Sequence, residues 1–169
     1  DTPSSRGLGD VYKRQIIENG LIIDGSGKSS YVGSIYIKNG RIAHLEKSLS
    51  NVKAKKNIDA IGKIVSPGFI DMHTHSERNS LDHPLVENYL QQGVTTMVGG
   101  NCGGSPFPIK DFINKTRSKG IGPNLALLIG HNTVRKEVMG TENRLANSDE
   151  LEDMKKLVEN SMKEGAFGM

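Results

Sequence analysis

Two histidines close an apolar stretch with a spacing that suits metal binding. Residues 64–75 read Ile-Val-Ser-Pro-Gly-Phe-Ile-Asp-Met-His-Thr-His. In a strand, side chains two residues apart share a face, so Asp71, His73 and His75 are expected to point the same way. Neutral imidazole is a good zinc ligand, and a same-face pair can reach one ion. The spacing therefore predicts a divalent-metal site, against the plainer alternative of two histidines hydrogen bonded to the backbone.

A glycine-rich segment offers a further ligand. Residues 99–105 read Gly-Gly-Asn-Cys-Gly-Gly-Ser and contain the single cysteine of the chain, Cys102. We predict that Cys102 is a thiolate ligand of the same metal. A buried inert thiol and a nucleophile paired with His131 are the alternatives. The segment lacks the lysine of a phosphate-binding loop and the spacing of a dinucleotide-binding loop, so its glycines are expected to let the backbone approach a metal or substrate.

Polar residues near these candidate ligands could hold them in place or contact a substrate. Asp71 either orients a ligand imidazole or pairs with a neighbouring donor. Asn101 precedes the cysteine, and His131 and Arg135 follow a later apolar stretch, where they either touch substrate or form the pocket wall. Glu77 lies just after the histidines and could bind water or a hydrogen-bond donor.

After Pro67 the sequence alternates between strand and helix patterns. The expected strands are 69–73, 94–98 and 124–129, and the expected helices are 84–92, 109–119 and one from an N-cap at Ser148 to Gly165, with a short helical turn at 133–138. This alternation implies a parallel sheet, in which ligands lie at the carboxyl ends of the strands. The candidate residues His73, His75, Cys102 and His131 all fall at such ends.

The N-terminal part has a different pattern. Residues 16–64 contain short β segments separated by turn signals, among them Asn19-Gly20 and the hairpin signal Asn39-Gly40. This β-rich layer is too small to close a core alone. Residues 1–15 lack an apolar period and resemble a translated sequencing adapter, so we treat them as a non-native leader. We expect the chain to be a fragment at both ends, with its true N-terminus missing.

Composition limits the classes of partner. Charged residues make up 24% and aromatic residues 5% of the 169-residue chain, which is typical of a soluble protein. Basic and acidic residues are interleaved, so no nucleic-acid partner is expected. No apolar run is long enough for a membrane span, so no membrane partner is expected either. A single cysteine excludes an internal disulfide and favours a cytoplasmic location.

Four motifs together resemble one known family. They are Val-Ser-Pro-Gly-Phe-Ile-Asp-Met-His-Thr-His at 65–75, Gly-Val-Thr-Thr-Met-Val-Gly-Gly-Asn-Cys-Gly at 93–103, Gly-His-Asn-Thr-Val-Arg at 130–135 and Glu-Gly-Ala-Phe-Gly at 164–168. The first resembles the first-strand signature of the amidohydrolase superfamily. The other three are similar to its D-aminoacylase branch, the N-acyl-D-amino-acid deacylases.

The resemblance implies an α/β fold. Residues 65–169 would be the N-terminal part of a (β/α)8 TIM barrel, with the first three βα units and the start of the fourth. Residues 16–64 would be part of a small β-sandwich. His73 and His75 match the family's metal-binding pair, and Cys102 matches a zinc-ligating cysteine. The family's catalytic aspartate and two further metal histidines would lie beyond Met169, so the catalytic base is unknown here.

The resemblance also implies an activity. The full-length parent is expected to be a zinc-dependent hydrolase of the amide bond of N-acyl-D-amino acids, with a small-molecule substrate, and the fragment itself is expected to be inactive. The alternatives are a dihydroorotase-like or isoaspartyl-dipeptidase-like amidohydrolase and a non-catalytic zinc-binding module. Glu77 stands where relatives commonly have Asp. No feature of the sequence indicates an oligomeric state.

Overall fold

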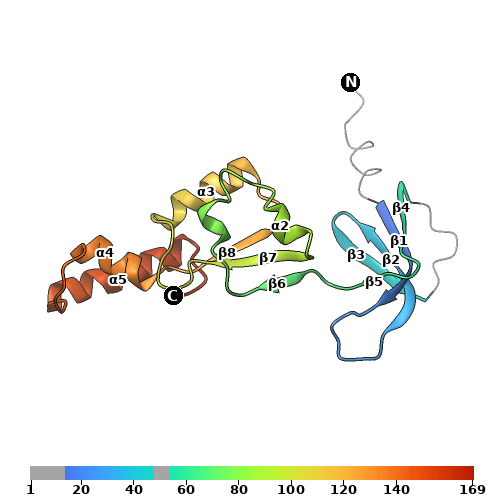
Figure 1. The fold of residues 1–169 in the computed structure, drawn as a ribbon, viewed down its shortest axis with the longest axis horizontal. Coiled ribbons are helices and arrows are strands. Elements are labelled where there is room, and N and C mark those ends of the chain that lie inside the picture. The colour runs from blue at the N-terminus through green and yellow to red at the C-terminus, as the bar shows by residue number, and fades with distance from the viewer. Residues whose placement is uncertain (1–13, 48–53) are drawn as a thin grey trace, which may run out of the picture. The chain divides into compact units, whose positions relative to one another are not determined.

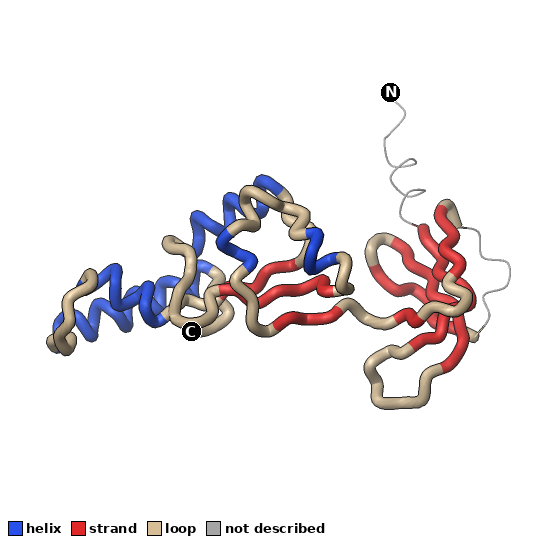
Figure 2. The backbone as a smooth tube through the Cα atoms, viewed as in Figure 1, coloured by secondary structure: helices blue, strands red, loops and turns tan. Residues whose placement is uncertain are grey.

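The computed structural model describes residues 14–47 and 54–169, and the chain divides between Pro67 and Gly68 into two compact units. Most of the predicted leader lies outside the described residues, but Arg14 and Gln15 begin the first strand. In Figure 2 the first unit contains strands and loops, whereas every helix of the described residues belongs to the second unit. No described helix has the length and apolar character needed to cross a membrane.

The first unit is a five-stranded mixed sheet. Its strands are β1 (Arg14–Ile22), β2 (Tyr31–Lys38), β3 (Arg41–Glu46), β4 (Lys56–Asp59) and β5 (Ile64–Val65). The order is β3-β2-β1-β4, with β5 also paired to β1. β2 pairs antiparallel with both β1 and β3, and β4 and β5 lie parallel to β1.

The two Asn-Gly signals of this unit have different outcomes. Asn39 and Gly40 have φ of 53° and 72° and join β2 to β3, which confirms the predicted hairpin. The turn predicted at Asn19-Gly20 is wrong, because these residues lie inside β1. Between Ile17 and Gly20, β1 contains one residue more than the paired segment of β2. Asn19 takes a φ of 60°, so the same tolerance of positive φ produces a bulge in place of a turn.

The second unit contains a three-stranded parallel sheet. Its strands are β6 (Phe69–Asp71), β7 (Val94–Gly99) and β8 (Asn124–Leu127), in the order β6-β7-β8. The parallel arrangement confirms the predicted mixed α/β class and brings the three carboxyl ends to one edge. β6 and β8 each end two residues earlier than predicted, although Leu128 continues β8 with an isolated bridge to Gly168.

Four α-helices and one short 3₁₀ helix complete this unit (Figure 1). They are η1 (Ser76–Arg78), α2 (Glu87–Leu90), α3 (Ile109–Lys119), α4 (His131–Met139) and α5 (Ser148–Glu164). α3 confirms its prediction, and α4 is longer than the turn expected there. The helix predicted at 84–92 shrinks to α2, because Val86 precedes it with a left-handed φ of 46°. Asn147, not Ser148, is the N-cap of α5.

The core of the second unit lies where α3, α4 and α5 meet the end of β8. Its buried members are Ile109, Ile129, Val134 and Ala166. Met154, Leu157 and Val158 of α5 pack against them, as their spacing predicts. Fully burying an isoleucine or valine side chain, such as those of Ile109 and Val134, stabilises the fold by about 1.5–3 kcal/mol. This packing fixes the start of α4 beside the carboxyl end of β8, next to the candidate ligands.

Candidate metal centre

The two histidines lie in the irregular segment that follows β6. The Asp71 carboxylate accepts a hydrogen bond from the backbone N–H of His73 at 3.1 Å, which turns the chain directly after the strand. Thr74 then donates its backbone N–H to the Val98 carbonyl at 3.0 Å, and His75 immediately precedes η1. The histidines are therefore positioned by this turn and by its bond to β7, and the strand alternation used to predict their shared face ends at Asp71.

The cysteine lies in a tight loop between β7 and α3. Gly100, Cys102 and Gly103 have φ of 83°, 54° and 77°. A Cβ on Gly100 would lie 2.2 Å from the Leu128 carbonyl oxygen, so this position requires glycine. Positive φ is uncommon for a non-glycine residue, and in the short loop it turns Cys102 out of the line of β7.

The start of α4 holds the other side of this loop. The Gly103 carbonyl accepts hydrogen bonds from the backbone N–H groups of Asn132 and Thr133, at 2.8 and 3.1 Å. The Ser105 N–H donates to the Thr133 hydroxyl at 2.9 Å, and the Gly130 N–H donates to the Ser105 hydroxyl at 3.0 Å. The cysteine loop is thus attached to a helix that the hydrophobic core already fixes.

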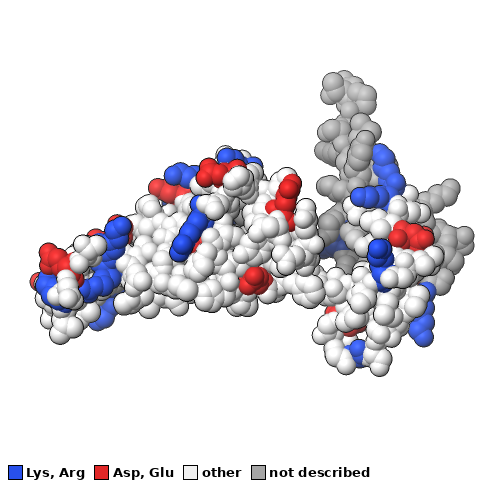
Figure 3. Space-filling view, in the orientation of Figure 1, with Lys and Arg blue, Asp and Glu red and all other residues white. Residues whose placement is uncertain are grey.

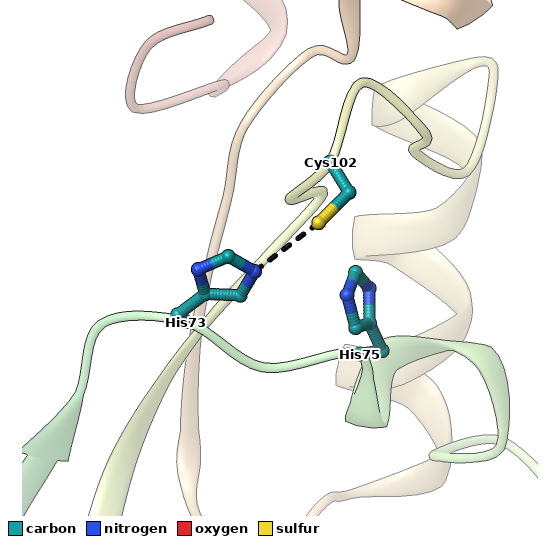
Figure 4. A group of neighbouring side chains, drawn as sticks. All are labelled: His73, His75 and Cys102. Carbon is teal, nitrogen blue, oxygen red and sulfur yellow. Dashed lines mark hydrogen bonds between the residues drawn. The ribbon is translucent and has the colours of Figure 1, made fainter.

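These segments bring two imidazoles and one thiol together (Figure 4). His73 Nε2 lies 3.3 Å from Cys102 Sγ, and one ligand atom from each of His73, His75 and Cys102 lies within 4.8 Å of the others. Figure 4 shows His73 and His75 on the segment after β6, with Cys102 facing them from the loop after β7. No other group of this kind occurs among residues 14–47 and 54–169.

The donors fit a zinc ion. Imidazole nitrogen and thiolate sulfur are both common zinc ligands, and three such protein ligands leave a coordination position open on a tetrahedral ion. The Nδ1 atom of His75 is buried and has no hydrogen-bond partner in the described part of the chain. A buried polar atom without a hydrogen-bond partner lowers the stability of the fold. A metal cation bound by the imidazole would supply the missing partner.

The other predicted site residues have separate places. Among the described residues, Asp71 pairs with the His73 backbone and not with an imidazole. Asn101 donates its side-chain amide to the carbonyls of Thr74 and Val98. His131 is exposed at the first position of α4. Arg135 binds the carbonyls of Glu142 and Arg144, at 2.7 and 2.8 Å, and so shapes the loop after α4.

Two buried side chains next to the histidines complete this region. The Thr74 hydroxyl donates to the Val98 carbonyl at 3.1 Å, and in the sequence only the place of Thr74 between the two histidines could have indicated this contact. Glu77 is 1% exposed and packs against Gly99, where a Cβ would lie 2.7 Å from Glu77 Oε2. Within the described residues, Oε2 has no hydrogen-bond partner.

A charge pair with two hydrogen bonds lies in the second unit outside the metal centre. Arg144 donates two hydrogen bonds to the Glu150 carboxylate, at 2.7 and 2.6 Å, and these lower the pKa of Glu150 to about 2. The Asn147 backbone N–H supports the same shift.

In Figure 3, basic and acidic side chains lie next to each other over the helices, with no broad patch of one sign on that face.

Comparison with known proteins decides the family. A sequence profile described as the amidohydrolase family matches residues 56–169. The chain belongs to the amidohydrolase family. Within that family, it is 31% identical to a D-aminoacylase from Alcaligenes xylosoxydans xylosoxydans, over 91% of this chain and 36% of the relative. An N-acyl-D-aspartate deacylase of the same organism is also 31% identical, over 91% of this chain and 35% of the relative.

A solved structure of this amidohydrolase group has the same fold. It is an N-acyl-D-glutamate deacylase from Bordetella bronchiseptica, complexed with zinc and a phosphonate inhibitor that mimics the tetrahedral intermediate of the reaction. The TM-score is 0.87 at 29% identity, over 92% of this chain and 37% of that one. The chain thus spans little more than a third of the length of the curated relatives that it matches.

Proposed function

We propose that the whole protein carrying this chain is a zinc-dependent hydrolase that cleaves the amide bond of N-acyl-D-amino acids, and that His73, His75 and Cys102 are among its zinc ligands. The observation that carries the proposal is the group of three donors within 4.8 Å, in a chain that belongs to the amidohydrolase family. The names of the relatives support the substrate class, because one is named a D-aminoacylase and the other two are named deacylases of an N-acyl-D-amino acid.

The residues of this chain would prepare the site for that reaction. When bound, zinc supplies Lewis-acid chemistry that favours attack on an amide carbonyl. In the described residues His73 and Cys102 are exposed, so their donor atoms are accessible to further groups. The donor group in the described residues contains no carboxylate. Following the family resemblance, the proposal assigns the general acid and base to an aspartate in another part of the whole protein.

The proposal includes the wider architecture. Residues 65–169 would form the first three βα units and the start of the fourth in a (β/α)8 barrel, and residues 16–64 would belong to a small β-sandwich. The similarity to the deacylase structure supports this arrangement. The proposed setting is the cytoplasm, because the single cysteine would act as a thiolate.

The test is metal content and hydrolysis in the whole protein. We expect the purified protein to contain zinc and to release D-amino acids from N-acetyl-D-amino acids faster than L-amino acids from the L-forms. His73→Ala and Cys102→Ala should each lower zinc content and reduce kcat/KM by about 100-fold, because each removes a ligand. His83→Ala, an exposed histidine of the same unit outside the donor group, is the matched control.

Other outcomes would contradict parts of the proposal. Unchanged zinc content in both ligand variants would show that the metal, if present, is bound elsewhere. Hydrolysis of dihydroorotate or of isoaspartyl dipeptides in place of acyl-D-amino acids would reject the substrate class. Zinc binding without any hydrolysis would indicate a non-catalytic module.

A further inference from the structure

One side chain joins the two segments that carry the candidate ligands. The Asn101 amide nitrogen donates to the Val98 carbonyl at 2.7 Å and to the Thr74 carbonyl at 3.3 Å. Thr74 lies between His73 and His75, and Asn101 directly precedes Cys102. Both partners are carbonyl oxygens, so the nitrogen of the amide must be the atom that faces them.

The Val98 carbonyl is the common point of these contacts. It accepts hydrogen bonds from the Thr74 backbone N–H at 3.0 Å, from the Thr74 hydroxyl at 3.1 Å and from Asn101. Thr74 is buried and Val98 is buried, so these bonds are shielded from water and are costly to lose. The end of β7 therefore holds the histidine segment and the cysteine loop through one network.

We infer that Asn101 is a positioning residue that sets the spacing between the imidazoles and the thiol before any metal binds. The inference rests on the metal site of the proposed function. On its other side the loop is fixed by the Gly103 carbonyl at the start of α4, so Asn101 supplies the restraint that faces the histidines. Groups that orient metal ligands typically change metal affinity by about 10–100-fold when they are removed.

The test uses the whole protein and measures zinc affinity by competition with a chelator, together with the visible absorption of the Co²⁺-substituted protein. We expect Asn101→Ala to weaken zinc binding by about 10–100-fold and to alter the Co²⁺ spectrum, since the ligands lose their fixed spacing. Asn124→Ala is the matched control. Asn124 also donates its amide to a β7 carbonyl, that of Thr95 at 3.0 Å, but at the opposite end of the strand from the cysteine loop.

A second variant separates hydrogen bonding from packing. Asn101→Asp keeps the size of the side chain but replaces the donor with an acceptor that faces two carbonyl oxygens. The added negative charge would attract a cation, so weaker zinc binding in this variant cannot be an effect of charge. The lost hydrogen-bond donor should weaken zinc binding, whereas the added charge should strengthen it. We expect the effect of the lost donor to be the larger.

The possible results distinguish this inference from the proposed function. If the wild-type protein binds no zinc, the proposed function fails and the inference fails with it. If wild type binds zinc and Asn101→Ala keeps its affinity and Co²⁺ spectrum, the inference alone fails. An Asn124→Ala variant that loses as much affinity as Asn101→Ala would also overturn it, as would tighter zinc binding by Asn101→Asp.

Discussion

At the scale of single residues, the cysteine loop depends on a glycine in the neighbouring segment. A Cβ on Gly130 would lie 2.2 Å from the carbonyl oxygen of Gly103, which is backbone and cannot rotate away. We expect Gly130→Ala to push the loop from the histidines, lower the free energy of unfolding by about 1–3 kcal/mol and weaken zinc binding. Thermal unfolding and zinc titration of the whole protein measure both effects.

Gly104 provides the comparison for this prediction. It lies in the same loop, and the nearest atom to an added Cβ is 4.0 Å away, the end of the flexible Arg78 side chain. Gly104→Ala should therefore leave zinc binding and stability nearly unchanged. Equal losses of stability and zinc affinity in the two variants would show that any added side chain disturbs the loop. The close approach of Gly130 to the Gly103 carbonyl would then not be the cause.

The sequence indicated the candidate ligands better than it indicated their supports. His73, His75 and Cys102 could be chosen from residue type and spacing, and the structure places them together. The argument from strand alternation did not describe how they are held, because β6 ends before the histidines. The contacts of Thr74 and Asn101 with Val98 depend on the pairing of distant segments, which no local pattern encodes.

At the scale of elements, α4 and α5 are joined by a loop with its own polar network. Arg135 binds two carbonyls of the loop, and Arg144 forms a bidentate pair with Glu150. Glu150 also accepts the backbone N–H of Asn147, whose side chain accepts the N–H of Glu150 in return. This capping box satisfies two free N–H groups at the start of α5, so the loop and the helix are stabilised together.

The network makes stability depend on pH in a defined direction. The pKa of Glu150 is lowered from 4.5 to about 2, so its contribution is complete above its ordinary pKa and is lost as pH falls from about 4.5 towards 2. We expect Glu150→Gln to lower the melting temperature near neutral pH, since it removes the charged partner of Arg144. The difference from wild type should shrink as the pH falls below about 4.5.

Thermal melts of both proteins across this pH range test the prediction, and Glu152→Gln is the control. Glu152 is an exposed glutamate of the same helix that pairs only with Lys155 in the described structure, and exposed pairs contribute little. A difference between Glu150→Gln and wild type that stays constant down to pH 3, or grows in acid, would contradict the pKa shift as its cause.

The element boundaries show where tertiary contacts override local sequence patterns. The bounds of α3 could be predicted, because its apolar spacing agrees with the core that buries it. The helix expected at 84–92 failed at Val86, where the chain adopts a left-handed conformation that β-branched residues rarely take. The N-cap of α5 was predicted one residue late, since Asn147 and Ser148 are both good caps and only the contact with Glu150 decides between them.

At the scale of the whole molecule, β6 and the residue that follows it, Met72, present apolar side chains to solvent. Phe69, Ile70 and Met72 are 61%, 61% and 66% exposed, and in the described sheet β6 pairs with a neighbour on one side only. Exposed apolar surface beside an unpaired strand edge favours association with other chains. In the longer protein proposed above, further strands of the barrel would cover this region.

Residues 1–169 expressed alone should therefore associate. We expect them to bind a fluorescent hydrophobic dye and to form concentration-dependent oligomers in sedimentation, whereas the whole protein should do neither through this surface. Ile70→Lys should reduce both signals, because it places a charge on the exposed strand. Leu145→Lys is the control, since Leu145 is 92% exposed on the loop between α4 and α5, away from the open strand edge. If Leu145→Lys reduces association as much as Ile70→Lys does, the chains associate through exposed apolar surface in general and not through the edge of β6. If neither variant changes it, the exposed face of β6 is not the surface through which the chains meet.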